Sequence, residues 1–483
     1  MKEIEFDLVI VGNGPTAIHF IDEFLSLKKN KKLKIAHINS DKNRDLNIDR
    51  LPNIDLYLNQ SSYTWKYLDS SSHLNNKEDI FYNFNSLFIG GLSRYWGAGI
   101  SELNEKDLGV NLNLQNFYIK LQKYINVFNV INNPLDKKLF RTNTIKSDKQ
   151  YSLKNPFNSI GTKITFGFAK KALYTKNNKK LDVKACNLCG GCNTYCFNNS
   201  IYNSANHFNP VESNDLKVFY NSTLESFEKN DEIYKLNIIQ DNKKKEIFAK
   251  KLILACGTVN TSKLILNYLH NSNIKIKSTP LLHNPVIRSV FLSFKIKPHD
   301  QPAGINIAFS DDNELYTTIM FGSDISTSDL LSFLPLKNNF IKILINKIKK
   351  FIVVTLTFFP SELSSTYIQF NGKNFTFKNS SKYNFLHFMY RMKSTFFQFI
   401  INFMFPIFVQ KLKDGSDLHH GGSFPIGSSS NINTNSNCEL INHSGLFVID
   451  GSWLPRISSK PHTYSLMANS RRVANIIFNK IIL

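Results

Sequence analysis

The stretch Phe6-Asp-Leu-Val-Ile-Val-Gly-Asn-Gly-Pro-Thr-Ala17, close to the N-terminus, decides the fold class. Its apolar half predicts a short buried strand, and apolar residues then recur at helical spacing from 18 to 25. A second apolar run, Leu33 to Ile38, predicts another strand. Strand, helix and strand in this order form a βαβ unit, so the sequence predicts a parallel sheet with a right-handed crossover.

The glycines between the first strand and the helix have the spacing of a dinucleotide-binding turn. Gly12 permits the tight turn, Gly14 lets the backbone approach a pyrophosphate, and the small Ala17 lets helix and strand pack closely. Pro15 and Thr16 open the helix, whose N-terminus attracts phosphate. An ordinary turn between strand and helix is the alternative, but the position of the pattern favours a dinucleotide site.

The end of the second strand departs from the usual dinucleotide pattern. An acidic residue normally stands there to hold the ribose hydroxyls, whereas this chain has Asn39. An amide can still hydrogen-bond a hydroxyl, so we predict that Asn39 belongs to the cofactor site.

The composition bounds the class of protein. The chain has 483 residues, of which 42% are hydrophobic, and this is enough for two or three globular domains. The formal net charge of +22 comes from short, scattered runs of lysine, which are typical of solvated faces, and no nucleic-acid motif accompanies them. The N-terminal residues lead into a strand without a signal-peptide pattern, so we expect a cytoplasmic protein without a nucleic-acid partner.

A second glycine-rich turn follows at Gly90-Gly-Leu-Ser-Arg-Tyr-Trp-Gly97. Paired glycines beside serine and tryptophan suit a backbone that lies against a flat ring, although a purely structural loop would also explain them. The candidate cofactor contacts in this turn are Gly90, Gly91, Ser93, Trp96 and Gly97.

The last seventy residues carry three further segments in a fixed order. They are His419-His-Gly-Gly-Ser-Phe-Pro-Ile-Gly427, then Leu446-Phe-Val-Ile-Asp-Gly451, then Lys460-Pro-His-Thr463 before a predicted helix. Together with the N-terminal turn, the turn at Gly90 and the strand Leu252-Ile-Leu-Ala-Cys-Gly257, they make the chain resemble the glucose–methanol–choline (GMC) oxidoreductases. The similarity is greatest to the bacterial branch with an HHxG motif, and it is poor in the middle of the chain.

This resemblance implies an FAD-dependent oxidoreductase that transfers a hydride from a CH–OH group of an alcohol, such as a sugar or glycoside, to the flavin. His419 matches the histidine that accepts the alcohol proton, and a histidine is suited to that task because its pKa is near working pH. His462 is the candidate for the second active-site position, with Ser459 as the alternative. The resemblance also places Asp450, Gly451 and Thr463 at the FAD.

Four cysteines, Cys186, Cys189, Cys192 and Cys196, have the spacing of bacterial ferredoxin ligands, although Phe197 stands where a proline usually follows. Three interpretations stay open: an iron–sulfur cluster that passes electrons from the flavin to an acceptor protein, a structural zinc ion held by four thiolates, and simple packing or a disulfide.

These observations predict an α/β fold, in which a Rossmann-like FAD-binding domain is interrupted by an α+β substrate domain with an antiparallel sheet. We expect the FAD-binding domain at residues 1–150, 205–285 and 415–483, with the active site in the last part. The cysteine cluster would form an insertion at 151–204, and the substrate domain would span 286–414.

Basic, Phe-rich helices are expected at 340–350 and 384–413, and a further helical region at 100–140. One stripe of the first of these helices is apolar and its lysines lie largely elsewhere: Phe340, Ile341, Leu344, Ile345 and Ile348 against Lys342, Lys347, Lys349 and Lys350. Such a helix usually faces a core, but peripheral contact with the inner face of a membrane also fits it.

Two rival functions remain at this point. The first is a flavin and iron–sulfur reductase that works in the opposite direction and does not need His419. The second is a basic, non-enzymatic flavin electron carrier, whose flavin no substrate would reduce.

Overall fold

The computed structural model describes most of the chain and both of its expected domains. The described residues are 5–28, 32–40, 86–87, 89–94, 96–122, 125, 127–128, 150–155, 158–168, 170–179, 183–187, 192, 196, 198–207, 216–293, 305–310, 314–322, 327–332, 339–379, 383–401, 404–427 and 432–482.

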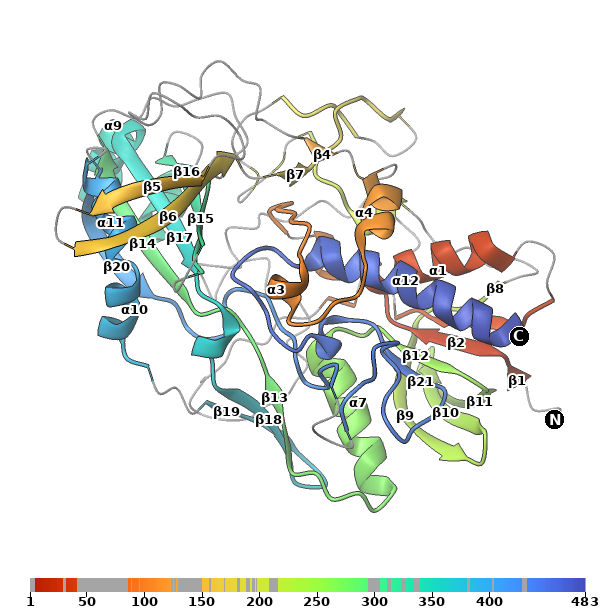
Figure 1. Ribbon diagram of the computed structural model, residues 1–483. Helices are drawn as coiled ribbons and strands as arrows, with labels where there is room; N and C mark the ends of the chain where they lie inside the picture. Colours follow the sequence, from red (N-terminus) through yellow and green to blue (C-terminus); the bar gives the residue numbers. More distant parts are fainter. Residues whose placement is uncertain are drawn as a thin grey trace.

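A five-stranded sheet, parallel throughout, forms the centre of the larger body, in the order β21-β12-β2-β3-β8 (Figure 1). The expected βαβ unit is present in it, because helix α1 joins β2 to its neighbour β3. The bounds are Leu8–Val11 for β2, Pro15–Lys28 for α1, Ile35–Ile38 for β3, Leu216–Phe219 for β8, Leu252–Leu254 for β12 and Leu446–Val448 for β21.

Both faces of this sheet are covered, which is why its strands read as continuous apolar runs. Leu8 and Ile10 pack towards α1 and the C-terminal helix α12 (Thr463–Ile482). Val9 and Val11, on the other face, pack with residues of helix α7 (Thr258–Asn271) and of a four-stranded sheet, β1-β11-β10-β9. The strands of that sheet are β1 (Glu5–Phe6), β9 (Ser222–Asn230), β10 (Ile233–Gln240) and β11 (Lys243–Ala249).

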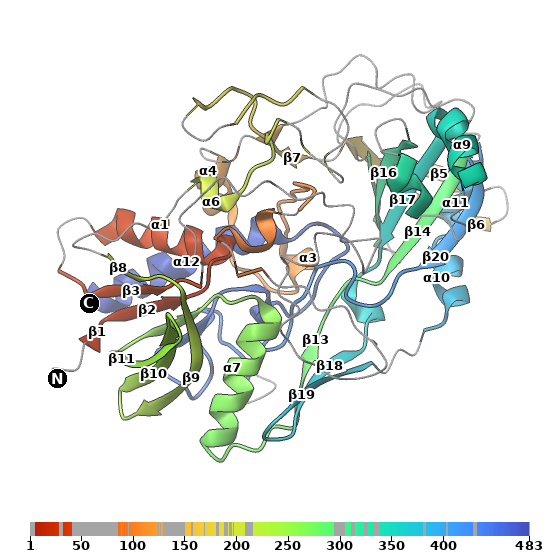
Figure 2. The same cartoon turned by 180° about the vertical axis from the view of Figure 1, so that it is seen from behind.

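A second body is built on a seven-stranded antiparallel sheet in the order β20-β14-β17-β16-β15-β6-β5. It lies at the end of the molecule away from both termini, as Figures 1 and 2 show from opposite sides. The strands are β5 (Gln150–Asn155), β6 (Asn158–Phe168), β14 (Val286–Ser293), β15 (Ile305–Ser310), β16 (Tyr316–Phe321), β17 (Ile352–Phe358) and β20 (Met404–Lys411).

Helices cover the two faces of the seven-stranded sheet. Helices α8 (Thr327–Ser332) and α9 (Asn339–Ile348) pack on one face with Val290 and Val354. Helices α10 (Phe385–Arg391) and α11 (Lys393–Ile401) pack on the other with Phe291. The parallel sheet and this antiparallel sheet with its helices confirm the predicted fold class.

Several smaller elements complete the structure. They are α3 (Glu105–Leu108), α4 (Gln115–Gln122), α6 (Ser204–His207), the strand pair β4 (Val127–Phe128) and β7 (Lys171–Ala172), and the three-stranded sheet of β13 (Ser278–Leu281), β18 (Thr366–Phe370) and β19 (Phe375–Asn379). None of the helices among the described residues has both the length and the apolar character to cross a membrane.

Three expectations differ from the structure. Among the described residues of 100–140, the helices are α3 and α4 and β4 is a strand; the capping box of Asn104 and Asp107 and the left-handed Gly109 confine α3 to one turn. Residues 404–411, expected in a helix, form the edge strand β20. Strands β5 and β6, expected in a cysteine-cluster insertion, belong to the sheet of the second body. The other domain boundaries stay predictions.

A buried ionic network fixes α1 against α12. Arg471 of α12 is 1% exposed; its Nη1 donates to Glu23 Oε2 at 2.8 Å, Nη2 donates to Asp22, and Nε donates to His19 Nδ1 at 3.2 Å. Because arginine only donates, His19 Nδ1 must accept, so Nε2 donates to the Tyr202 hydroxyl at 2.8 Å. The network holds the helix whose N-terminus carries the Gly12 turn.

Replacing Arg471 with leucine should therefore destabilise the protein by about 3 kcal/mol, because Glu23 and Asp22 would lose their shared guanidinium and Glu23 would keep only Lys120 and Asn475 as partners. Urea unfolding followed by circular dichroism measures the loss. Lys480→Leu is the matched control on the same helix, since its pair with Glu439 is exposed and its loss should cost about 1 kcal/mol or less. Equal losses in the two variants would contradict this view of the network.

Candidate active site

One cavity of about 550 Å³ collects most of the residues that the sequence predicts for the cofactor and for catalysis. It lies where the parallel strands β2 and β12 end, which is the usual binding crevice of such sheets. The predicted residues that line it are Gly12, Gly14, Pro15, Thr16, Gly91, Ser93, Trp96, Gly97, His419, Asp450, Gly451, His462 and Thr463.

Gly12 allows the ends of β2 and β12 to meet. Its φ is +127°, and a Cβ there would lie 2.2 Å from the carbonyl oxygen of Ala255. Only glycine tolerates both this conformation and this approach. A Cβ on Gly14, in contrast, would have nothing within 4 Å, because it would extend into the cavity.

The N-terminus of α1 faces the cavity through Gly14, Pro15 and Thr16 and has no acidic residue in its first turn. A second helix N-terminus, that of α7, reaches the cavity at Gly257 and Thr258. Both ends carry partial positive charge, so this part of the cavity favours an anion such as a pyrophosphate.

At the end of β3, the residue that lines the cavity differs from the predicted one. Asn39 is 1% exposed and does not line the cavity; its backbone N–H donates to Phe219 O and its carbonyl accepts from Ser222 N, both at 2.9 Å. The next residue, Ser40, lines the cavity, and its Oγ accepts from Asn13 Nδ2 at 2.9 Å. Ser40, rather than Asn39, is therefore the residue at this strand end that lines the cavity.

The turn at Gly90 closes over the N-terminal turn. Gly90 donates its backbone N–H to Asn13 O at 2.8 Å without lining the cavity, and a Cβ on Gly91 would lie 2.9 Å from Gly14 Cα. Trp96 is anchored by Nε1, which donates to Tyr202 O at 2.8 Å. Ala17, also predicted at the site, is instead buried in the core beneath the turn.

His419 and His462 meet at the other end of the cavity. Their ring centroids are 4.7 Å apart and the rings are nearly perpendicular, at 76°. Phe358 of the second body stacks on His419 with a centroid distance of 5.5 Å. Ser459, the alternative for the second position, is buried and does not line the cavity. His420 lines it as well, and its backbone carbonyl accepts from Thr258 Oγ1 at 2.6 Å.

Asn284 fixes the tautomer of His419. Its Nδ2 donates to Phe359 O at 2.7 Å and to Ser458 O at 3.2 Å, and carbonyl oxygens can only accept. The other amide atom, Oδ1, therefore accepts from His419 Nδ1 at 2.8 Å. Neutral His419 thus carries its proton on Nδ1 and leaves the lone pair on Nε2.

The surroundings keep both histidines neutral. Burial, followed by the nearby rings of His462 and His420, holds the pKa of His419 well below its ordinary value of 6.5. Burial lowers the pKa of His462 to about 4. Burial also raises the pKa of Asp417, which lines the cavity and whose Oδ2 accepts from Asn284 N at 2.6 Å.

Asp450 stabilises the loop below this end of the cavity. Its Oδ1 accepts from the backbone N–H and the hydroxyl of Ser452, at 3.0 and 2.6 Å, and its Oδ2 accepts from Thr261. Thr463 begins α12, so a third helix N-terminus faces the cavity.

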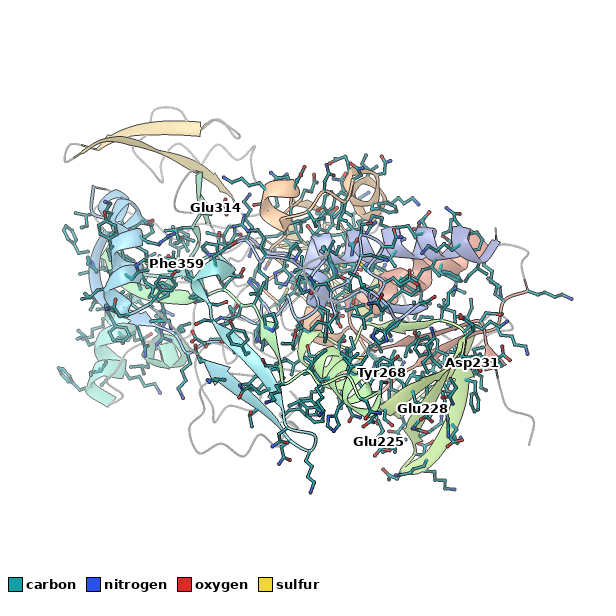
Figure 3. The ribbon with its side chains drawn as sticks, turned by 60° about the horizontal axis from the view of Figure 1, so that its bottom comes forward. Glu225, Glu228, Asp231, Tyr268, Glu314 and Phe359 are labelled. Atoms are coloured by element: carbon teal, nitrogen blue, oxygen red, sulfur yellow. The ribbon has the colours of Figure 1, made fainter. Side chains whose placement is uncertain are left out.

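The second body supplies a wall that sequence reasoning missed. Tyr316 and Thr318 of β16 and Leu356 and Phe358 of β17 line the cavity from one face of the antiparallel sheet. Their alternation along the strands marks a common face, but only the fold shows that this face is opposite His419. On the far side, Glu225 of β9 lies at the cavity rim, and Figure 3 shows it beside α7.

Of the four clustered cysteines, Cys186, Cys192 and Cys196 are described, and none of these three lines the cavity. Cys189 is outside the described residues; Cys192 is buried, and Cys186 and Cys196 are half-buried. The backbone N–H of Ser200 donates to Cys196 Sγ at 3.1 Å. Among the described residues, no group of three or more metal-ligating side chains is found, so neither iron–sulfur nor zinc gains support.

The residues present fit FAD. The lining residues include two helix N-termini, Ser40 and the pair His419–His462, and Gly14 and Gly257 leave open space where a Cβ would otherwise stand. Asn13 Oδ1 is buried and has no hydrogen-bond partner among the described residues. A buried acceptor of this kind is typical of a group that binds a ligand. A phosphate-bearing dinucleotide satisfies these features at one end and leaves the histidines for its reactive ring.

Comparison with solved structures shows the same fold in pyridoxine 4-oxidase from Mesorbium loti. The TM-score is 0.61, and the match covers 98% of this chain and 99% of that one at 12% sequence identity. No protein-family model and no curated protein sequence matches the chain. The likeness confirms the fold that the GMC resemblance implied and, at this identity, shows the fold alone.

Gly14→Leu should fold but bind no flavin, because the new side chain would enter the cavity without meeting the protein. Gly12→Ala should instead lose about 3 kcal/mol or more of stability, since its Cβ would meet the Ala255 carbonyl. Visible absorbance after reconstitution with FAD, together with thermal unfolding, separates the two defects. Full flavin content in Gly14→Leu would contradict the assignment of this turn.

Proposed function

We propose that the protein is an FAD-dependent oxidoreductase that oxidises an alcohol, with His419 as the base. The observation that carries the proposal is the pair of histidines at one end of a cavity whose other end has the features of a pyrophosphate site. FAD, when bound, supplies the acceptor for a hydride from the alcohol carbon. The protein must then bind the alcohol and take its hydroxyl proton.

His419 is prepared for that proton. The Asn284 amide keeps the Nδ1–H in place, so Nε2 can accept without any change of tautomer. The depressed pKa keeps the base neutral at working pH. After the proton arrives, the Asn284 oxygen still accepts from Nδ1–H, and this hydrogen bond stabilises the cation. His462 has a buried Nδ1 without a partner among the described residues, so it is free to orient the same hydroxyl.

The wall opposite His419 favours a compact alcohol with a ring or an apolar body over the sugar or glycoside that the sequence suggested. Leu356 and Phe358 are apolar, and Thr318 Oγ1 is a buried hydroxyl that lacks a partner among the described residues. One such hydroxyl suits a substrate with few polar groups. The structural neighbour is named as an oxidase of pyridoxine, a small ring compound with hydroxymethyl groups, and this agrees with the preference.

The route by which electrons leave stays part of the proposal. An iron–sulfur cluster at the cysteines would make the protein a dehydrogenase with a protein acceptor, whereas reaction with oxygen would make it an oxidase. Iron content and peroxide formation during turnover decide between them.

His419→Gln should retain flavin but lower the rate of flavin reduction by alcohol about 10²- to 10⁴-fold, because glutamine cannot take the proton. Anaerobic stopped-flow bleaching of the flavin absorbance, with a panel of benzylic, pyridine-methanol and sugar alcohols, measures this rate.

The rival functions predict other results. A reductase would keep full turnover in His419→Gln, and an electron carrier would show no bleaching with any alcohol in the wild type. His443→Gln is the control, because this histidine is bound to Tyr268 away from the cavity and its loss should leave the rate unchanged.

The pH profile tests the neutral base directly. Because the pKa of His419 is lowered, the base should stay unprotonated down to acidic pH, so kcat/KM should be level from pH 6.5 upward and fall only below that value. Asn284→Asp places a carboxylate beside the ring, which favours its cation, and should move the acid limb to higher pH. An acid limb above pH 7 in the wild type, or an unmoved limb in the variant, would contradict His419 as the base.

A further inference from the structure

Exposed apolar side chains gather on four elements of the second body. Of the twelve large hydrophobic residues that are exposed among the described residues, all but Ile119, Ile274 and Tyr367 lie on α9, α10, α11 and β20. Phe340 and Ile343 of α9 are 74% and 60% exposed, and Leu386 of α10 is 72% exposed. A concentration of this kind on one part of a soluble surface marks an interaction site.

The four elements share one end of the molecule. β20 is the edge strand of the seven-stranded sheet, α9 packs on one face of that sheet and α10 and α11 on the other. Figures 1 and 2 show all four at the end opposite the termini, and Figure 3 shows side chains extending outward from this end. We call the exposed apolar residues of this region the apolar end: Phe340, Ile343, Leu344, Phe385, Leu386, Tyr390, Ile400, Phe405 and Ile407.

Helix α9 has more apolar surface than its packing uses. Ile345 is 2% exposed and contributes to the core of the second body. Phe340, Ile343 and Leu344 lie on another side of the same helix and face solvent. The helix is therefore apolar on two sides, although docking on the sheet needs only one. Burying the exposed side would remove a large apolar area from water.

Cations predominate in the segment that carries the apolar end. From 339 to 413 the sequence contains a single acidic residue, Glu362, and this residue is paired with Arg456. Exposed lysines flank the apolar side chains, including Lys342 and Lys347 on α9 and Lys393 at the start of α11. The Lys393 ammonium lies 4.3 Å from the centroid of the Tyr390 ring. Apolar side chains flanked by lysines are suited to a lipid bilayer, because the apolar groups can enter the acyl region while the ammonium groups stay at anionic headgroups.

We propose that the apolar end docks on an anionic lipid membrane, with α9 lying in the interface. Two copies of this lysine-rich face would repel each other, which disfavours a dimer through it. Pro406, exposed on the edge strand, lacks the N–H that a strand added by another protein would use. Aliphatic residues such as Ile343 would gain nothing from a nucleic-acid backbone. The proposal is independent of the reaction in the cavity.

The test uses the full chain and vesicles in a sedimentation assay. We expect binding to vesicles of phosphatidylcholine with about 30% phosphatidylserine, weak binding to phosphatidylcholine alone, and a decrease at high salt. The combined variant Phe340→Ser/Ile343→Ser/Leu344→Ser should lower the partition coefficient about tenfold or more. Ile119→Ser/Ile274→Ser, which removes exposed apolar residues elsewhere, is the matched control and should bind like the wild type.

A second variant reports insertion without removing apolar surface. Phe340→Trp should bind like the wild type, and its added fluorescence should shift to the blue and be quenched by brominated lipid in anionic vesicles.

The proposal would be overturned by equal binding of the serine variant and the wild type, or by the absence of a preference for anionic vesicles. It would also be overturned if the wild type ignored vesicles but formed a dimer, or bound polyglutamate, through the same residues. Thermal unfolding of each variant shows whether it is folded.

Discussion

The rest of the structure depends on the close approach of two backbones at Gly12. The end of β2 can pass beside Ala255 at the end of β12 only because Gly12 lacks a Cβ and adopts a φ of +127°. That approach brings the N-termini of α1 and α7 to one place, and the cavity begins between them. The buried Arg471–Glu23 pair holds α1 against α12. This contact fixes the helix that follows the Gly12 turn.

The opposite end of the cavity is assembled from distant parts of the chain. His419 and His462 belong to the C-terminal segment, whereas Asn284 precedes β14 of the second body and binds both His419 and the carbonyl of Phe359. The two bodies therefore meet at His419, the base in the reaction we propose. A shift of one body against the other would change the hydrogen bond that sets the tautomer, so the chemistry we propose depends on their contact.

The sequence was informative where a pattern is local. The strand, the glycine turn and the helix around Gly14 follow from a short stretch, and the ordered C-terminal motifs predict His419 and His462, whose rings meet in the cavity. Ser40 lines the cavity where the pattern predicts Asn39, and which of the two does so depends on how β3 continues towards Ser222. Asn284 and Phe358 could not be found, because no local pattern distinguishes an amide or a ring that reaches the site through tertiary packing. Residues 404–411 form a strand although their sequence favours a helix, because apolar side chains on both sides of an edge strand show no alternation.

The most direct test of this account is a crystal structure of the protein reconstituted with FAD. We expect the pyrophosphate against residues 12–16 and the N-terminus of α1, and the flavin ring at the end of the cavity that His419 and His462 line. A pyrophosphate bound elsewhere, or a ring remote from both histidines, would contradict the assignment of the cavity and of the base.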